Sequence, residues 1–235
     1  MNWQAAAINP RERFIVALDV PTKAEALSLV RHLSPHPGLF KIGLQLYTAA
    51  GPEMVRAVHD LGGRVFLDLK LHDIPNTVSR AVESAGSLGV EMFTLHLSGG
   101  RAMIEAAVRA AAPGMLLLGV TVLTSANQET LREVGVHSSL PEQVLRLAQL
   151  GVESGISGLV ASPHELLPLR SAHGSKVKIV TPGIRPDGAP AGDQKRTMTP
   201  AEAIKTGADF LVIGRPITAA SDPRAAFEQI ATDAV

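Results

Sequence analysis

The sequence predicts an α/β protein that folds as a single (β/α)8 TIM barrel over residues 1–235. Eight short apolar runs recur along the chain, and helix-like segments separate them. Most of these runs are continuous in apolar residues, as in parallel strands that are buried on both faces. Eight such units in 235 residues also fit a fold that typically takes about 250 residues.

The expected strands, in chain order, are Phe14–Asp19, Leu39–Gly43, Arg64–Lys70, Met92–His96, Met115–Thr121, Gly158–Ala161, Lys178–Thr181 and Phe210–Ile213. An open, doubly wound sheet is the competing fold, and it usually binds its ligand at one switch point between two strands. In this chain, polar residues follow the first, second, third, fifth, seventh and eighth strands. They converge at one place only if the sheet closes, which favours the barrel.

Helix starts can be read from capping signals. Three hydroxyl residues are each followed, three positions later, by a glutamate. In a capping box, the hydroxyl accepts a hydrogen bond from the glutamate N–H, and the glutamate side chain accepts one from the N–H of the hydroxyl residue. The pairs are Thr22 with Glu25, Ser162 with Glu165 and Thr199 with Glu202. Pro163 and Pro200 add the proline that is favoured at the first helical position. These signals predict where helices begin and carry no information about chemistry.

Composition excludes several classes of protein. The chain has 22 basic and 22 acidic residues, one Trp, one Tyr and no cysteine. The missing cysteine excludes disulfides, thiolate metal sites and a cysteine nucleophile, and the balanced charge argues against nucleic acid as a partner. The longest apolar stretch, Met115–Leu123, is too short to cross a bilayer, and Met1–Phe14 has no signal-peptide core. We therefore expect a cytoplasmic protein with no membrane partner.

The third expected strand carries charges where a buried strand should have none. Side chains alternate along a strand, so Asp68 and Lys70 should share one face while the neighbouring leucines take the other. Buried charges of opposite sign are costly unless they are paired. Active sites of barrels lie at the carboxyl ends of strands. Together with Asp73 just beyond, this position favours catalysis over a structural ion pair.

Two further charges lie at the ends of the first two strands. Asp19 ends the first strand, where an aspartate is often only a helix cap. Lys41 lies between Phe40 and Ile42, so its ammonium must reach a polar mouth or a carboxylate. A ligand-contacting lysine is therefore favoured over a surface lysine.

The composition of residues 182–196 predicts a mobile loop that binds phosphate. The segment contains three Gly and three Pro, and structureless loops of this length in compact domains are usually lids or mobile segments. Arg185, Gln194, Lys195 and Arg196 can hold an anion; a tolerant solvated loop is the alternative. Gly214 and Arg215 end the last strand, where barrels often bind phosphate through backbone amides and a fixed cation.

No metal or cofactor is expected. The histidines at 59, 72, 96 and 164 lack metal-ligand spacing, and no H-E-x-x-H or G-x-S-x-G motif occurs. His96, at the end of the fourth strand, is equally well explained as a mouth residue or as a hydrogen-bonded structural histidine. What remains is acid–base and electrostatic chemistry on a small phosphorylated molecule.

The chain resembles the orotidine 5′-phosphate decarboxylase family of the bacterial type. The central motif is Asp68-x-Lys70-x-x-Asp73-Ile74-Pro75-Asn76-Thr77, and the other matching segments, in the family's order, are Ala17–Asp19, Phe40–Gly43, Leu123–Ser125, Thr181–Arg185, Gly192–Arg196 and Ile213–Arg215. The first half of the central motif is shared with related sugar-phosphate barrels, whereas its continuation through I-P-N-T is specific to this family.

The resemblance implies cofactor-free conversion of orotidine 5′-monophosphate to uridine 5′-monophosphate and CO2, the last step of de novo UMP biosynthesis. It implies that Lys70 donates a proton to pyrimidine C6, flanked by Asp68 and Asp73. It also implies a homodimer in which Asp73 and Thr77 reach the partner's site. The implied substrate contacts are Asp19 and Lys41 with ribose, Thr124 and Ser125 with the pyrimidine region, Arg185, Gln194, Gly214 and Arg215 with phosphate, and Ile74 and Pro182 elsewhere on the substrate.

Two alternatives stay open. A related sugar-phosphate barrel, such as a hexulose-phosphate synthase or a keto-gulonate-phosphate decarboxylase, would use a magnesium-bound enediolate and would lose activity in chelator. A catalytically silent phosphate-binding barrel would bind nucleotide without turnover. The lysine between two acids argues against this second alternative, because a binding protein has no need of it.

Overall fold

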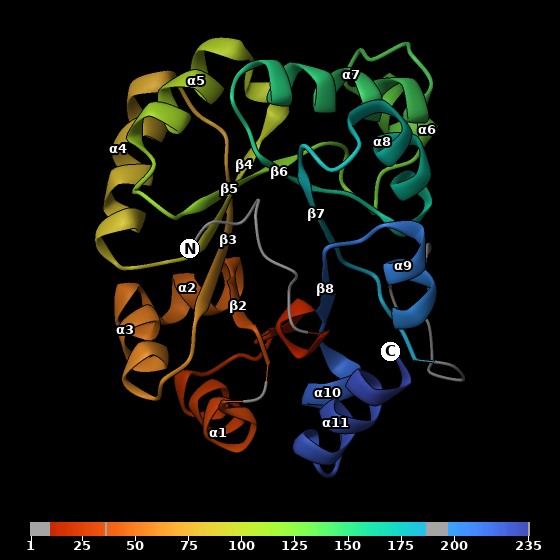
Figure 1. The fold of residues 1–235 in the computed structure, drawn as a ribbon. Helices are drawn as coiled ribbons and strands as arrows, with labels where there is room; N and C mark the ends of the chain where they lie inside the picture. Colours follow the sequence, from red (N-terminus) through yellow and green to blue (C-terminus); the bar gives the residue numbers. More distant parts are fainter. Residues whose placement is uncertain (1–9, 36, 187–196, 235) are drawn as a thin grey trace.

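The computed structural model describes residues 10–35, 37–186 and 197–234. Within these ranges, eight parallel strands close into a barrel in chain order, from β1 round to β8 and back to β1. Figure 1 shows the helices arranged around the outside of this barrel. The predicted (β/α)8 barrel is therefore confirmed. The strands are β1 Phe14–Ala17, β2 Leu39–Gly43, β3 Val65–Leu71, β4 Met92–His96, β5 Leu116–Val120, β6 Gly158–Val160, β7 Lys178–Thr181 and β8 Phe210–Ile213.

The strand boundaries agree with the expected ones to within two residues. Four strands, β2, β4, β7 and β8, have the expected bounds. The largest difference is at β1, which ends at Ala17 rather than Asp19. Strand ends fray into loops, and a carboxylate that points into a barrel mouth need not stay in the ladder.

The described α-helices are α1 Lys23–Leu33, α2 Leu44–Ala50, α3 Pro52–Asp60, α4 Pro75–Ser87, α5 Arg101–Ala110, α6 Gln128–Glu133, α7 Leu140–Glu153, α8 Leu166–His173, α9 Pro200–Thr206, α10 Arg215–Thr218 and α11 Pro223–Asp233. Short 3-10 helices span Pro10–Arg13, Leu97–Gly99 and Pro163–Glu165. No helix in the described part of the chain is long and apolar enough to cross a membrane.

The three predicted helix caps are present. Thr22 accepts a hydrogen bond from the Glu25 N–H, and full capping boxes form at Ser162 and Thr199. Ser162 begins a 3-10 turn that leads into α8, rather than α8 itself. A further capping box, in which Ser139 pairs with Glu142, begins α7 and was not predicted, although the sequence carries the same signal.

Two apolar layers explain why the strand sequences are continuous in apolar residues. Alternate strand residues point inward and form a separate cluster inside the barrel: Ile15, Ala17, Leu39, Phe66, Met92, Leu116, Leu118, Val180, Phe210 and Val212. The residues between them, such as Leu67 and Phe93, point outward and belong to the larger cluster with the helices. Each strand is therefore buried on both faces, and inward positions near the carboxyl ends are left for polar groups.

Candidate active site

A cavity of about 440 Å³ opens at the carboxyl ends of the strands. Its floor is apolar and comes from the cluster inside the barrel, including Phe66, Val180 and Val212. Its walls come from the carboxyl-terminal parts of the strands and the segments after them, and they carry the charged and hydroxyl side chains of Asp19, Lys41, Asp68, Lys70, Thr124, Arg185, Arg215 and Thr218. Pro182, Gly183 and Gly214 complete these walls. The polar residues that follow separate strands converge here because the sheet closes.

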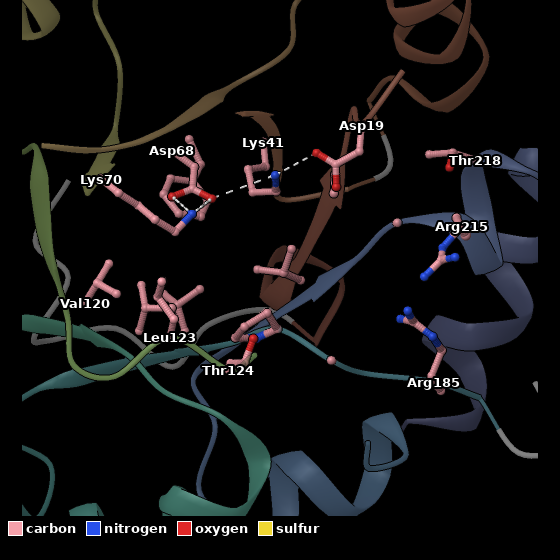
Figure 2. Close-up of a pocket in the computed structure, with 18 of the residues that line it drawn as sticks. Asp19, Lys41, Asp68, Lys70, Val120, Leu123, Thr124, Arg185, Arg215 and Thr218 are labelled. Carbon is pink, nitrogen blue, oxygen red and sulfur yellow. Dashed lines mark hydrogen bonds and ion pairs between the residues drawn. The ribbon is translucent and has the colours of Figure 1, made fainter. Parts of the chain in front are cut away.

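A row of alternating charges lines one side of the cavity (Figure 2). The Lys41 ammonium lies 2.9 Å from Asp19 Oδ1 and 3.8 Å from Asp68 Oδ2. Lys70 Nζ donates to both carboxylate oxygens of Asp68, at 2.9 and 2.8 Å. The side chains of Lys41 and Asp68 are only 11% and 12% exposed, so each needs its neighbour's opposite charge.

The shared face of Asp68 and Lys70 is confirmed, but β3 is not regular there. Leu69 and Leu71 pack outward against the helices, as the alternation predicts. Lys70, however, has a φ of +50°, which among the described residues makes it the single non-glycine residue with positive φ. This conformation costs roughly 1–2 kcal/mol for an L-residue. Strain of this kind persists only where the surroundings hold it, and here it lies at the charged end of the cavity.

Gly43 makes room for the first ion pair of the row. A Cβ at this position would lie 3.1 Å from Lys41 Nζ and 3.3 Å from Asp19 Oδ1. Both distances are tighter than ordinary van der Waals contact, so a side chain would push the two groups apart. Gly43 was not predicted as a site residue, because the need for a glycine comes from the contact between Lys41 on β2 and Asp19 after β1.

Two arginines lie at the other end of the cavity. Figure 2 shows the guanidinium groups of Arg185 and Arg215 facing each other, well away from Lys70. Arg185 is buried and donates to the carbonyl oxygen of Ile184 at 2.8 Å. Burial lowers the pKa of Arg185 below its usual value, and the positive charge of Arg215 lowers it further. Two cations held together in this way favour an anionic ligand, such as a phosphate, between them.

Apolar side chains close the space between the two charged ends. Val120, Val122 and Leu123 come from the end of β5 and the segment after it, next to Thr124. Figure 2 shows Val120, Leu123 and Thr124 across the cavity from the charge row. A flat ring could therefore pack on this wall while its edge meets Lys70. Val120 and Thr218 line the cavity but were not predicted, since isolated apolar or hydroxyl residues carry no motif. Leu123 also lines it; it belongs to a matching segment but was not predicted as a site residue.

Several predicted site residues do not line the cavity of this chain. Asp73, Ile74, Thr77 and Ser125 are exposed and are not among its lining residues. Asp73 Oδ1 instead accepts a hydrogen bond from the Ile74 N–H at 2.6 Å. Gln194, with most of the predicted loop, lies outside the described residues. The roles expected for these residues stay predictions.

His72 and His96 lie together beside the charge row. Their ring centroids are 5.6 Å apart, and His96 is half-buried. Burial lowers the pKa of His96, and the positive charges of His72 and Lys70 lower it further against the opposite effect of Asp68. His96 is therefore favoured in its neutral form. Within the described ranges, no cluster of three or more His, Asp or Glu side chains could hold a metal ion.

Comparison with known proteins places the chain in a family. Residues 12–230 match the model of the orotidine 5′-phosphate decarboxylase / HUMPS family. The chain is similar to two curated proteins named orotidine 5′-phosphate decarboxylase. The one from Moorella thermoacetica is 51% identical over 235 residues, covering 96% of this chain and 93% of the relative. The one from Opitutus terrae is 56% identical over 219 residues, covering 92% of this chain and 95% of the relative.

Among solved structures, the crystal structure of orotidine 5′-phosphate decarboxylase from Lactobacillus acidophilus is similar, with a TM-score of 0.84 and 37% identity. That match covers 94% of this chain and 98% of the other. A family model that spans nearly the whole barrel and relatives with about half of their residues identical lead to one conclusion. This chain belongs to the orotidine 5′-phosphate decarboxylase / HUMPS family.

Proposed function

We propose that this protein catalyses the cofactor-independent decarboxylation of orotidine 5′-monophosphate to uridine 5′-monophosphate and CO2, the last step of de novo UMP biosynthesis. One observation carries the proposal: a single cavity holds the row Asp19, Lys41, Asp68 and Lys70 at one end and the Arg185–Arg215 pair at the other. The names of the relatives support the same substrate. A nucleotide with a phosphate at one end and a reacting ring at the other matches this polarity.

The chemistry requires a cation beside the ring. Loss of CO2 from C6 leaves an electron pair in the plane of the pyrimidine, where the π system cannot delocalise it. An ammonium about 4 Å away stabilises such a charge by about 4 kcal/mol at an effective dielectric near 20. Lys70 is the ammonium that we assign to this task, and it then delivers its proton to C6. Asp68 holds that ammonium through both carboxylate oxygens.

The rest of the cavity orients the substrate. Arg185, Arg215 and the Gly214 backbone would hold the phosphate, and Asp19 and Lys41 the ribose hydroxyls. Thr124, Ser125 and Pro182 would contact the remainder of the nucleotide, and Gln194 would reach the phosphate from the loop 182–196. Phosphate binding is remote from the bond that breaks, so its free energy is available for desolvating the charged groups at the reacting end of the cavity.

We further infer that the working unit is a homodimer in which Asp73 and Thr77 enter the neighbouring site. Both residues are exposed and lie outside the cavity of their own chain, just beyond Lys70. Large apolar side chains, namely Leu44, Ile74 and Leu123, are also exposed after β2, β3 and β5. An apolar rim around the mouth is what an interface between two copies would cover. The cytoplasmic location stays a prediction.

The test follows the loss of pyrimidine absorbance when purified protein meets orotidine 5′-monophosphate in the presence of a chelator. The parent protein should turn over, and Lys70→Ala should not. Lys205→Ala, an exposed lysine on α9, is the control and should match the parent. A parent that is inactive until magnesium and a sugar phosphate are supplied would show that the proposed reaction is wrong, while the family assignment would stand.

A further inference from the structure

The irregular part of β3 has one opposing residue on β4. The two strands pair at Leu67 with Phe93 and again at Leu71 with Leu95. Three residues of β3, from Asp68 to Lys70, therefore face a single residue of β4, Thr94. Regular ladder bonds cannot form over this interval, because the two strands advance by different numbers of residues.

The Thr94 side chain forms two hydrogen bonds with β3 where the regular backbone hydrogen bonds are missing. Its hydroxyl accepts a hydrogen bond from the backbone N–H of Lys70 at 2.9 Å. The same hydroxyl donates to Asp68 Oδ1, also at 2.9 Å. Thr94 is 0% exposed and does not line the cavity, so water cannot replace these bonds and the side chain does not meet a ligand. One hydroxyl thus joins the strained backbone of Lys70 to the carboxylate that holds the Lys70 ammonium.

We propose that Thr94 is a positioning residue: its hydroxyl fixes the positive φ of Lys70 and the orientation of the Asp68 carboxylate, and so places the Lys70 ammonium against the substrate. This inference rests on the proposed function, in which Lys70 is the proton donor. Of the two bonds, the one to the Lys70 N–H supports a backbone conformation that a regular strand would not adopt. The bond to Asp68 keeps one carboxylate oxygen directed at both Thr94 and Lys70.

Thr94→Val removes the hydroxyl with little change in shape, and Thr94→Ser keeps it. We expect Thr94→Val to lower kcat about 10- to 100-fold, as for small displacements of a reacting group, with KM within about threefold of the parent. Thr94→Ser should recover most of the lost kcat. Thr121→Val is the matched control: this buried threonine after β5 bonds the Val160 carbonyl oxygen and should leave kcat unchanged.

Thermal unfolding of all the variants checks that they fold. A kcat for Thr94→Val within about threefold of the parent, or a Thr94→Ser variant as impaired as Thr94→Val, overturns the inference. An inactive parent overturns the proposed function instead, and the crystal structure of Thr94→Val then decides the role of Thr94. Loss of the positive φ at Lys70 in that crystal structure supports the role, and an unchanged Lys70–Asp68 geometry overturns it.

Discussion

At the scale of single residues, the charged side chains of the site differ in burial, so removing them should cost different amounts of stability. Lys41 and Asp68 are nearly buried, and removing one partner of a buried pair typically costs about 3–5 kcal/mol. Substituting either would therefore mix loss of activity with loss of stability. The side chain of Lys70 is 29% exposed, and Lys41 still lies 3.8 Å from Asp68 when Lys70 is removed, so Lys70→Ala should cost less stability. This difference is why Lys70→Ala is the more informative test of the chemistry.

Arg215 provides a test at the far end of the cavity. We expect Arg215→Ala to lower kcat/KM for orotidine 5′-monophosphate by several orders of magnitude, because phosphate binding energy is used to reach the transition state. Steady-state kinetics of the variant would measure this loss. Arg224→Ala, which removes an exposed arginine from α11, is the control and should have no effect. A loss smaller than about tenfold would contradict a phosphate role for Arg215.

At the scale of elements, β3 changes character along its length. Val65, Phe66 and Leu67 are buried, and Leu67 is still in register with β4. From Asp68 on, the register shifts and the strand carries the charges of the site. Irregular strand segments commonly re-aim side chains beside active sites. Leu69 and Leu71 of this segment pack against the surrounding helices, but the ends of those helices can be altered separately from the site.

The capping box of α7 offers such a test. The Ser139 hydroxyl donates to Glu142 Oε2 at 2.7 Å and accepts from the Glu142 N–H at 3.4 Å. Ser139→Ala should lower the Tm by about 2–4 °C, while kcat stays at the parent value. Ser84→Ala is the control, because that exposed hydroxyl lies within α4 and bonds only the Arg80 carbonyl oxygen. An unchanged Tm for Ser139→Ala, measured by calorimetry, would show that this cap does not contribute.

At the scale of the whole molecule, the barrel gathers residues that are far apart in sequence, and a second copy would add more. The cavity contains both ends of the expected substrate site, yet Asp73 and Thr77 lie outside it on the surface. The homodimer proposed above would resolve this arrangement, since a twofold axis would let each copy supply the same residues to the other.

Mixing two inactive variants tests the shared site. Lys70→Ala and Asp73→Ala should each be nearly inactive alone. A mixed dimer has one site with both substitutions and one site with neither, so random equal mixing should restore about one quarter of the parent activity. Co-expression with two different purification tags isolates the mixed dimer. Failure to regain activity in the isolated mixed dimer, or full activity of Asp73→Ala alone, would refute the sharing of Asp73.

The sequence by itself determined the barrel and the face on which its charges lie. Continuous apolar runs at regular intervals predict strands buried on both faces, and alternation along β3 predicts that Asp68 and Lys70 share a face. Both follow from local geometry that every strand obeys. The predicted helix caps hold for the same reason, because a capping box involves residues only three positions apart.

Only the tertiary structure decided which side chains meet. The contacts of Lys41 with Asp19 and Asp68, the space that Gly43 leaves for them and the Thr94 bonds all join different strands. Such contacts depend on the register between neighbouring strands, and a pattern of apolar residues along one strand does not encode it. The positive φ of Lys70 lies within the register shift between β3 and β4, and such a shift is a property of how the two strands pair rather than of either strand's sequence pattern.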